Sequence, residues 1–325
     1  MPEEETITLS VNHTTPAEAG GALVLQSWAE RIEERTEGRI DFDFYWSSSL
    51  LDIPDTVPGV ADGRADISYA IAHHHSGYFP ITGELLGMPF MGYPDIVSAA
   101  QIHEDLMDVF PEINEQFENA GVKPIYIGCM PIYQLFLTTT DEVSAPEDIS
   151  GLDIIAEKRP SAQLINKINA TPQEIEVGDW YMSLDRGVAD GAISHFSVAD
   201  AVGVLGLFEQ HVLFGDQGFN MDFDMLLMNP DTYENLPEDL RLIFDEELEW
   251  FRENYQRVSV EETEMFMDVA RDKGHIMNKL SEEEISGWEE LAEPIHEEIL
   301  EELEEEGIPA NEIYEEIQKL NEEYQ

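Results

Sequence analysis

The stretch that decides the fold runs from Gly151 to Gly191 and reads GLDIIAEKRPSAQLINKINATPQEIEVGDWYMSLDRGVADG. The apolar run at 152–155 predicts a strand, and the apolar stripe of Ile165 and Ile168, which follows Pro160, predicts a helix. The alternating residues 175–177 predict a second short strand, and the segment closes in a glycine-bounded turn. This order of strand, helix, strand and turn is typical of an α/β ligand-binding module.

The same alternation of strands and helices recurs on both sides of this stretch. Strand patterns occupy residues 7–11, 40–45, 65–71, 123–127, 135–139 and 223–228. Helical patterns occupy residues 22–32, 57–61, 237–273 and much of 281–325, where Ser281 and Glu284 form a capping box. Strands that alternate with helices predict a mostly parallel sheet, and a chain of 325 residues suits two domains. We expect the Glu-rich C-terminal helices to pack over one of them with a solvated acidic face, a partner-binding helix being the alternative.

The charge of the chain excludes several classes of partner. Seventy acidic and 16 basic residues give a net charge of -54, which disfavours nucleic acid and anionic membrane surfaces. Acidic residues are spread along the whole chain, as expected of a protein that works in high salt, where charge repulsion is screened within about 3 Å at 1 M. An acidic protein that works at ordinary ionic strength is the alternative.

Cysteine content and the N-terminus bear on the compartment. Cys129 is the single cysteine, so no intrachain disulfide can form, and its apolar neighbours predict a buried thiol. No segment approaches the roughly 18 apolar residues that span a membrane. Met1–Glu5 has neither the basic start nor the apolar core of a signal peptide, so we expect the numbering to start at a mature or recombinant end.

The opening stretch resembles the substrate-binding proteins of tripartite ATP-independent periplasmic (TRAP) transporters, dicarboxylate-binding type. That family reads roughly D-L-x-G-L-K-I-R, then G-A-x-P, then E-x-Y-x-A-L-Q-x-G-x-x-D-G. The corresponding residues here are Asp148, Gly151, Leu152, Ile154, Ala170, Pro172, Asp179, Tyr181, Leu184, Arg186, Gly187, Asp190 and Gly191. Segments 49–67, 86–90 and 228–239 resemble further family motifs in the same order, so that the likeness covers about residues 5 to 275.

This resemblance implies a fold, a function and a compartment. The fold is α/β and two-lobed, like periplasmic binding proteins, with mixed sheets, a ligand cleft between the lobes and a long helix spanning both. The first lobe is expected to comprise residues 1–124 and about 213–250, and the second 125–212 and about 251–325. The function implied is capture of a small molecule by lobe closure outside the cytoplasm and delivery to the membrane subunits of an ion-gradient-driven transporter. We expect a monomer without cofactor, while a ligand-binding sensor module of a signalling system is an alternative.

Candidate catalytic and metal-binding patterns fail on geometry. The triplet His73-His74-His75 invites a metal site, but adjacent residues rarely converge on one ion. The triplet follows the predicted strand 65–71, a position at which the resemblance implies a cleft loop. His195 follows Asp190-Gly191 and is a candidate hydrogen-bonding wall residue, catalytic base or structural histidine, in that order. We find no glycine-rich phosphate loop and no strained nucleophile elbow, and therefore expect no enzyme.

The position that matches the family's carboxylate-binding arginine is Ile155. An aliphatic residue cannot replace a bidentate guanidinium, so we expect a neutral or cationic polar ligand such as an amino alcohol or a polyol. The alternative is a carboxylate bound through Lys158 or Arg159.

The remaining candidate ligand-binding residues are mostly aromatic and acidic, a set suited to amines and polyols. They are Trp46, Tyr69, His73, Asp179, Trp180, Phe196 and Phe219, with Asp216 and Asp222 nearby. Several of these aromatic residues are alternatively core residues; Trp46 and Phe219 suit either position equally, whereas Trp180 and Tyr69 are favoured for the cleft.

Overall fold

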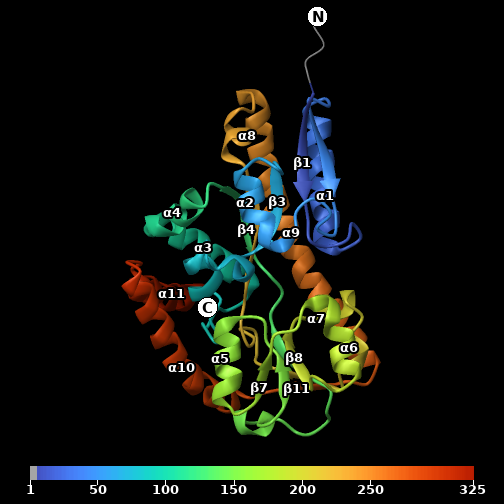
Figure 1. The fold of residues 1–325 in the computed structure, drawn as a ribbon, viewed down its shortest axis with the longest axis vertical. Coiled ribbons are helices and arrows are strands. Elements are labelled where there is room, and N and C mark those ends of the chain that lie inside the picture. Colours follow the sequence, from blue (N-terminus) through green and yellow to red (C-terminus); the bar gives the residue numbers. More distant parts are fainter. Residues whose placement is uncertain (1–5) are drawn as a thin grey trace, which may run out of the picture. The chain divides into compact units, whose positions relative to one another are not determined.

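The computed structural model describes residues 6–325, whose order of helices and strands is drawn in Figure 1. The expectation for Met1–Glu5 lies outside the described residues. The chain forms two compact units. Unit 1 contains the described residues up to Gly83, Met107–Cys129 and Phe223–Val260; unit 2 contains Glu84–Leu106, Met130–Asp222 and Glu261–Gln325.

Unit 1 is built on a five-stranded mixed sheet. Its strand order is β2 (Ile40–Tyr45), β1 (Ile7–Asn12), β3 (Ile67–Ile71), β10 (Phe223–Met228) and β4 (Lys123–Cys129). Strand β1 runs parallel to β2 and β3, whereas β10 runs antiparallel to β3 and β4. The helices of this unit are α1 (Gly20–Arg35), α2 (Thr56–Ala61), α4 (Pro111–Asn119), α8 (Pro230–Glu234) and the first part of α9 (Glu238–Asp272).

The core of unit 1 forms where the apolar stripe of α1 meets the sheet. Trp28 is fully buried and its ring contacts Phe42 of β2 and two phenylalanines of α9, Phe244 and Phe251. This packing explains the helical period of 22–32 and the alternation of 40–45, since both patterns mark the residues that face one core. Cys129 is buried, as predicted.

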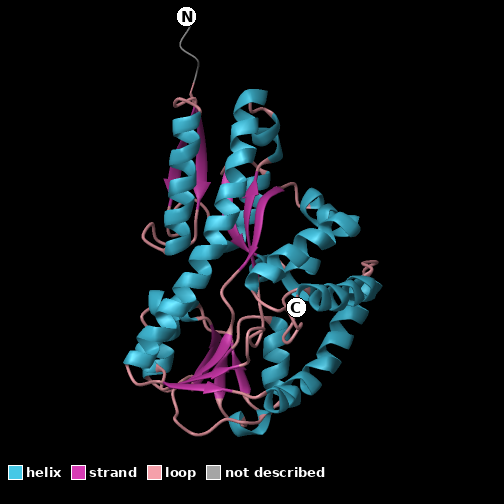
Figure 2. Cartoon of the chain, turned by 180° about the vertical axis from the view of Figure 1, so that it is seen from behind, coloured by secondary structure: helices cyan, strands magenta, loops and turns pink. Residues whose placement is uncertain are grey.

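Unit 2 is built on a six-stranded mixed sheet. Its order is β11 (Ile276–Lys279), β9 (Gln210–Leu213), β5 (Gln134–Leu137), β8 (Gly191–Ser194), β6 (Asp153–Ile155) and β7 (Thr171–Gln173). Strand β5 is antiparallel to β8 and β9, and the remaining pairs are parallel. The helices are α3 (Ile96–Val109, up to Leu106), α5 (Arg159–Lys167), α6 (Trp180–Asp185), α7 (Phe196–Ala201), the end of α9, α10 (Glu282–Glu305) and α11 (Ala310–Tyr324). Figure 2 shows the strands of both sheets in magenta.

Within the opening stretch, one expected element was misplaced. The second strand is Thr171–Gln173, and the residues predicted as that strand, 175–177, lead instead into a 3₁₀ turn at Val177–Asp179. Pro172 is tolerated in β7 because β7 is the last strand of its sheet and one side needs no backbone donor. Ile175 and Val177 still pack against the core of unit 2, which explains their alternation without a strand.

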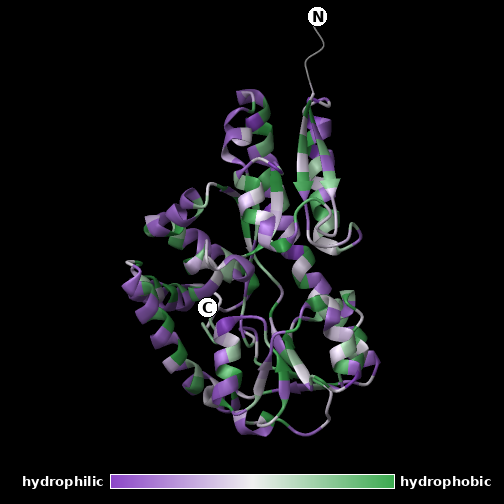
Figure 3. Cartoon of the chain, viewed as in Figure 1, coloured by the Kyte–Doolittle hydropathy of each residue, from purple (hydrophilic) through white to green (hydrophobic). Residues whose placement is uncertain are grey.

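The C-terminal helices pack over unit 2. Helix α10 begins with the predicted capping box of Ser281 and Glu284 and buries the stripe that includes Trp288 and Ile295. Figure 3 shows hydrophilic and hydrophobic residues alternating along α10, and this helix packs against α5 and α11.

These helices also hold the segment 86–93. The His296 ring donates to the carbonyl oxygen of Pro89 at 2.7 Å, and the Asn321 side chain donates to that of Met91 at 2.8 Å. Phe90 has a φ of 55°, which is unusual for a bulky residue, and its backbone N–H donates to the carbonyl of Phe219. Contacts of this kind account for the position of 84–106 in unit 2.

The division into units differs from the expected lobes in two respects. The expected first lobe included residues 84–106, which lie in unit 2. The chain passes between units at 129/130, 222/223 and 260/261, where the expected boundaries were near 124, 213 and 250. The first two passages lie at the end of β4 and the start of β10, so the whole of both strands stays in one sheet. Helix α9 contributes residues to both units. In the described part of the chain no helix is long and apolar enough to cross a membrane.

Candidate functional site

Three aromatic rings gather near the carboxyl ends of strands β1 and β2 in the unit 1 sheet. His13 directly follows β1, Trp46 directly follows β2, and Tyr69 lies in β3, so the parallel register brings them together. The His13 and Tyr69 rings stack with centroids 4.3 Å apart, and the His13 and Trp46 rings lie 5.6 Å apart. The Tyr69 hydroxyl donates to Asp224 of β10 at 3.2 Å. We call His13, Trp46, Tyr69 and Asp224 the aromatic cluster. Ligands in open α/β sheets bind beside the carboxyl ends of strands.

The loop that carries Trp46 has an unusual backbone. Ser47 and Ser48 both have positive φ, 54° and 56°, which is uncommon for residues other than glycine. Their N–H groups donate to the carbonyl oxygens of Thr15 and His13, respectively. These bonds fix the Trp46 loop against the turn after β1, and backbone strain of this kind is common at functional sites.

His73 lies in the 3₁₀ turn Ala72–His75 that follows β3. Its ring lies against that of His74, with centroids 4.0 Å apart. His75 is buried, and burial lowers its pKa to about 4, with a smaller contribution from His73. Among residues 6–325 no three His, Cys, Asp or Glu side chains are placed to hold a metal ion together.

A second group of polar residues gathers in unit 2 near the start of α5. The Lys158 ammonium forms an ion pair with Asp222 at 3.2 Å and donates to the carbonyl oxygen of Met221 at 2.9 Å. It also lies over the Tyr133 ring, 4.5 Å from the centroid. The polar cluster consists of Tyr133, Lys158, Ser161, His195, Asn220 and Asp222, all of which are buried. Ser161 contacts the Asn220 side chain, and His195 meets the Tyr133 ring edge-on at 5.1 Å.

His195 caps a helix. Its Nδ1 accepts a hydrogen bond from the N–H of Val198 and lies 2.9 Å from the Ser197 hydroxyl, at the start of α7. Burial and, to a smaller extent, the positive charge of Lys158 lower the pKa of His195 to about 3, whereas Asp222 opposes both. A ring with so low a pKa is a weak base at neutral pH, which disfavours a role as a catalytic base. His195 thus caps α7 through Nδ1, and its ring packs against Tyr133 of the cluster.

Four expected ligand-binding residues lie in hydrophobic cores. Ile155, Trp180 and Phe196 belong to the core of unit 2, and the Trp180 indole N–H donates to the carbonyl of Ile175. Phe219 is fully buried among aromatic rings that include Phe90 and Trp288. Trp180 and Phe196 therefore lie in the core and not in the cleft positions expected for them. Ile155 and Phe219 are core residues of unit 2 as well.

Two charged candidates lie at the surface of unit 2. Asp179 is exposed at the end of a 3₁₀ turn. Arg159 is exposed and forms ion pairs with Glu84 at 2.5 Å and Glu302 at 2.6 Å, which raise its pKa. Its guanidinium is therefore engaged on both sides by the protein's own carboxylates.

Five residues of the two clusters were not expected, namely His13, Asp224, Tyr133, Ser161 and Asn220. His13 is the residue after the first strand, a position from which the strand-end rule could have found it. Tyr133 and Asn220 carry no signal in the sequence; they meet because the backbones of residues 133 and 220 pair in an isolated bridge.

A comparison with protein families assigns the chain. Residues 11–303 match the profile of DctP, the bacterial extracellular solute-binding proteins of family 7. The chain belongs to this family. Among curated DctP-like relatives, a solute-binding protein of Chromohalobacter salexigens is 27% identical over 190 residues, which are 55% of this chain and 52% of that protein. The C4-dicarboxylate-binding periplasmic protein DctP of Rhodobacter capsulatus is 23% identical over 176 residues, 54% and 52% of the two chains. The chain thus spans about half the length of these relatives.

Solved structures share the fold along nearly the whole chain. A marine metagenome TRAP solute-binding protein specific for aromatic acid ligands superposes with a TM-score of 0.87 at 20% identity, over 98% of this chain and 99% of that one. A TRAP protein of Chromohalobacter salexigens with bound D-glucuronate superposes with a TM-score of 0.84 at 19% identity, over 96% and 99%. At such identities the likeness establishes the fold, which confirms the predicted α/β architecture of two mixed sheets.

Proposed function

We propose that this protein is the solute-binding component of a TRAP transporter, which captures a small polar metabolite outside the cytoplasm and presents it to the membrane subunits. The observation that carries the proposal is the family match over residues 11–303, on a chain whose fold follows TRAP binding proteins throughout. Transport is driven by an ion gradient in this proposal, and the protein acts as a monomer in the periplasm or an equivalent compartment.

The surface charge supports a salt-adapted setting. With a net charge of -54, the protein repels itself strongly at low ionic strength, and salt screens that repulsion. The 16 basic residues cannot neutralise the 70 acidic ones. Two of them, Arg31 and Arg35, bind the same carboxylate, that of Glu247.

The charges of the polar cluster favour a ligand that is neutral or cationic. The only basic side chain of the cluster, Lys158, is already paired with Asp222, and His195 is neutral because of its low pKa. Ile155 supplies no cation, and Arg159 is bound to Glu84 and Glu302. Among the neighbouring polar groups are hydroxyls and amides, which suit the hydroxyl groups of a polyol or an amino alcohol. In unit 1, taken by itself, the rings of the aromatic cluster have faces that suit carbon-bound hydrogens or an ammonium group.

An organic acid is the second candidate, because relatives of this fold were solved with aromatic acids, benzoate and D-glucuronate. Here Lys158 is the cation best placed to meet a carboxylate, since it is buried whereas Arg159 is exposed.

Ligand identification tests the proposal. Mass spectrometry of compounds retained through purification should find one small polar solute, and the protein freed of it by unfolding and refolding should gain thermal stability when a matching compound is added. The panel contains D-sorbitol and ethanolamine for the first candidate, and benzoate and D-glucuronate for the second. A protein stabilised by none of the retained or added solutes would contradict the proposed function.

A charge-balanced variant separates the two candidates. In Lys158→Gln/Asp222→Asn both charges are removed together, so neither partner is left as an uncompensated buried ion. If a carboxylate binds through Lys158, this variant should lose its response to benzoate and D-glucuronate. If the ligand is neutral, the response to it should survive, and Arg159→Ala serves as the matched control that should change neither response.

A further inference from the structure

His13 is held in one protonation state by the backbone beside it. Its Nδ1 lies 3.1 Å from the backbone nitrogen of Thr15 and 3.0 Å from the Thr15 hydroxyl. A backbone N–H can only donate, so Nδ1 is the acceptor. The ring of a neutral imidazole then carries its single proton on Nε2, which points away from the turn after β1.

This Nε2–H group is buried and has no hydrogen-bond partner among the described residues. The whole His13 side chain is 2% exposed. Burial lowers the pKa of the ring to about 3, so the ring stays neutral and the donor stays in place at any pH at which the protein works. Buried donors without partners are rare in native proteins because each forfeits its bond to water. An oxygen acceptor on a bound solute would satisfy this donor.

The side chains around the His13 ring indicate which part of a solute lies next to the acceptor oxygen. Tyr69 stacks on the imidazole with an angle of 19° between the rings, and Trp46 tilts against it at 48°. The Nε2–H bond lies in the plane of the imidazole, so an acceptor approaches its edge and not its stacked face. Both aromatic rings pack against the imidazole, and such rings favour contact with carbon atoms or a flat group.

We propose that His13 selects the solute by donating a hydrogen bond from Nε2 to an oxygen acceptor on it. The inference rests on the proposed function and narrows the ligand class: the solute carries a hydroxyl, carbonyl or carboxylate oxygen beside an apolar or flat portion. A simple amine without an oxygen atom is excluded, since an ammonium group has no acceptor for this donor.

Two variants test this role. His13→Phe keeps a ring in the stack with Tyr69 but removes the donor, and His13→Gln keeps an N–H donor at a similar distance along the side chain. The probes are matched pairs with and without an oxygen acceptor: ethanolamine against propylamine, and benzoate against benzylamine. The readout is the dissociation constant by calorimetry, with the thermal midpoint of the solute-free proteins beside it.

We expect wild type to bind one oxygen-bearing member of a pair and not its amine counterpart. His13→Phe should bind that compound about ten- to a hundredfold more weakly, and His13→Gln should recover part of the loss. His13→Phe removes the unsatisfied Nε2 donor and also the Nδ1 acceptor of the Thr15 N–H, so the thermal midpoint without solute is measured only to show that both variants are folded at the assay temperature. A loss of binding by folded His13→Phe that His13→Gln partly recovers is not expected of a merely structural histidine.

The failures of the two proposals are distinguishable. If wild type and His13→Phe bind the same probe equally, the role of His13 is refuted while the proposed function stands. If wild type binds no probe and no retained solute, the proposed function falls and the role of His13 with it. Nitrogen NMR of the solute-free protein is an independent check, since a proton found on Nδ1 of His13 would overturn the inference.

Discussion

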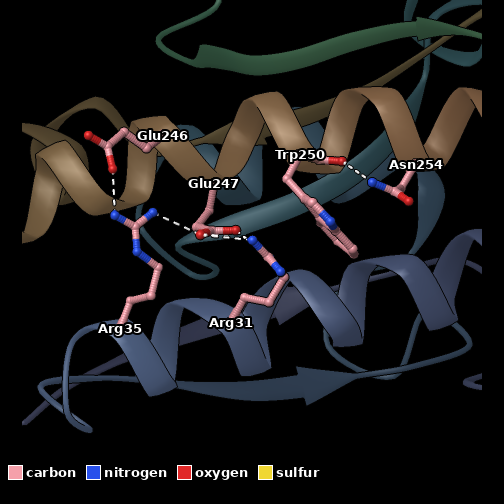
Figure 4. A network of polar contacts seen from close by, with 6 residues as sticks. All are labelled: Arg31, Arg35, Glu246, Glu247, Trp250 and Asn254. Carbon is pink, nitrogen blue, oxygen red and sulfur yellow. Dashed lines mark hydrogen bonds and ion pairs between the residues drawn. The ribbon is translucent and has the colours of Figure 1, made fainter.

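Glu247 of helix α9 should be among the most stabilising charged residues of unit 1. Its side chain is 3% exposed and accepts hydrogen bonds from Arg31 Nε at 2.5 Å and from Arg35 at 2.8 Å (Figure 4). The Arg31 guanidinium also lies over the Trp250 ring, 4.6 Å from its centroid. Burial opposes the charge, but the two guanidinium groups outweigh it and lower the pKa of Glu247. One carboxylate therefore joins α1 to α9.

The substitution Glu247→Gln should destabilise the protein by about 2–3 kcal/mol. Hydrogen bonds to charged groups contribute about 1.5–3 kcal/mol each, and the amide group of glutamine would face a guanidinium that can only donate. Loss of one partner from a fully buried pair costs about 3–5 kcal/mol. The value here is lower because the arginines are 43% and 39% exposed and water can solvate them.

The assay is urea unfolding with a matched control. Glu246→Gln removes a neighbouring carboxylate that binds only Arg35 and is 51% exposed, so it should cost about 0–0.5 kcal/mol. Raising KCl from about 0.5 M to about 2 M should abolish the destabilisation by Glu246→Gln and leave most of that by Glu247→Gln, since salt screens exposed charges much more than buried ones. Because the folded-state pKa of Glu247 is lowered, its contribution is present above pH 4.5 and disappears as pH falls through the folded value. Equal losses for the two variants would refute the reasoning.

Three further predictions concern unit 2. Trp180→Ala should lower the free energy of unfolding by about 3–5 kcal/mol, because the ring is buried in the core. The dissociation constant for the solute should not change below the melting transition. A loss of binding without that loss of stability would show that Trp180 contacts the ligand. Arg159→Ala removes exposed ion pairs with Glu84 and Glu302 and should change stability by less than about 1 kcal/mol in urea unfolding, so a larger loss would show that these pairs are not solvent-screened. Burial lowers the pKa of His211 from 6.5 to about 3, so the protein loses stability as pH falls from 6.5 toward that value. His211→Phe should reduce this loss by about 1.4 kcal/mol per pH unit. Parallel plots of stability against pH for the two proteins would contradict this prediction.

Local periodicity accounts for what was predicted well. Residues 7–11 and 223–228 were expected as strands, and 22–32 and 237–273 as helices, because the period of apolar residues depends only on the local backbone. The exception in the opening stretch also has a local cause. The second strand was expected at 175–177 and not at 171–173, which contains Pro172. An edge strand accepts proline, and only the order of strands in the sheet shows that β7 is an edge.

The candidate site was predicted less well, because a side chain's direction depends on what packs against it. Trp180 was expected to face a ligand, but the core of unit 2 covers it. Tyr69 lies in β3, where its ring stacks on His13 and its hydroxyl donates to Asp224. The sequence separations of these three residues contain no hint of the contact, which arises from the order of β1, β3 and β10 in the sheet.

The sequence by itself determined the family, the two-sheet α/β architecture and the acidic character, since motif order, period and charge are properties of the linear chain. Only the tertiary structure decided which of the residues in Gly151–Gly191 serve the core and which polar groups meet. Ile155 marks an absent arginine in the sequence, but in the fold it is a core residue, and Lys158, three residues along the chain, is a buried cation paired with Asp222. The physical reason is that burial and charge pairing come from contacts between distant segments, which no local pattern records.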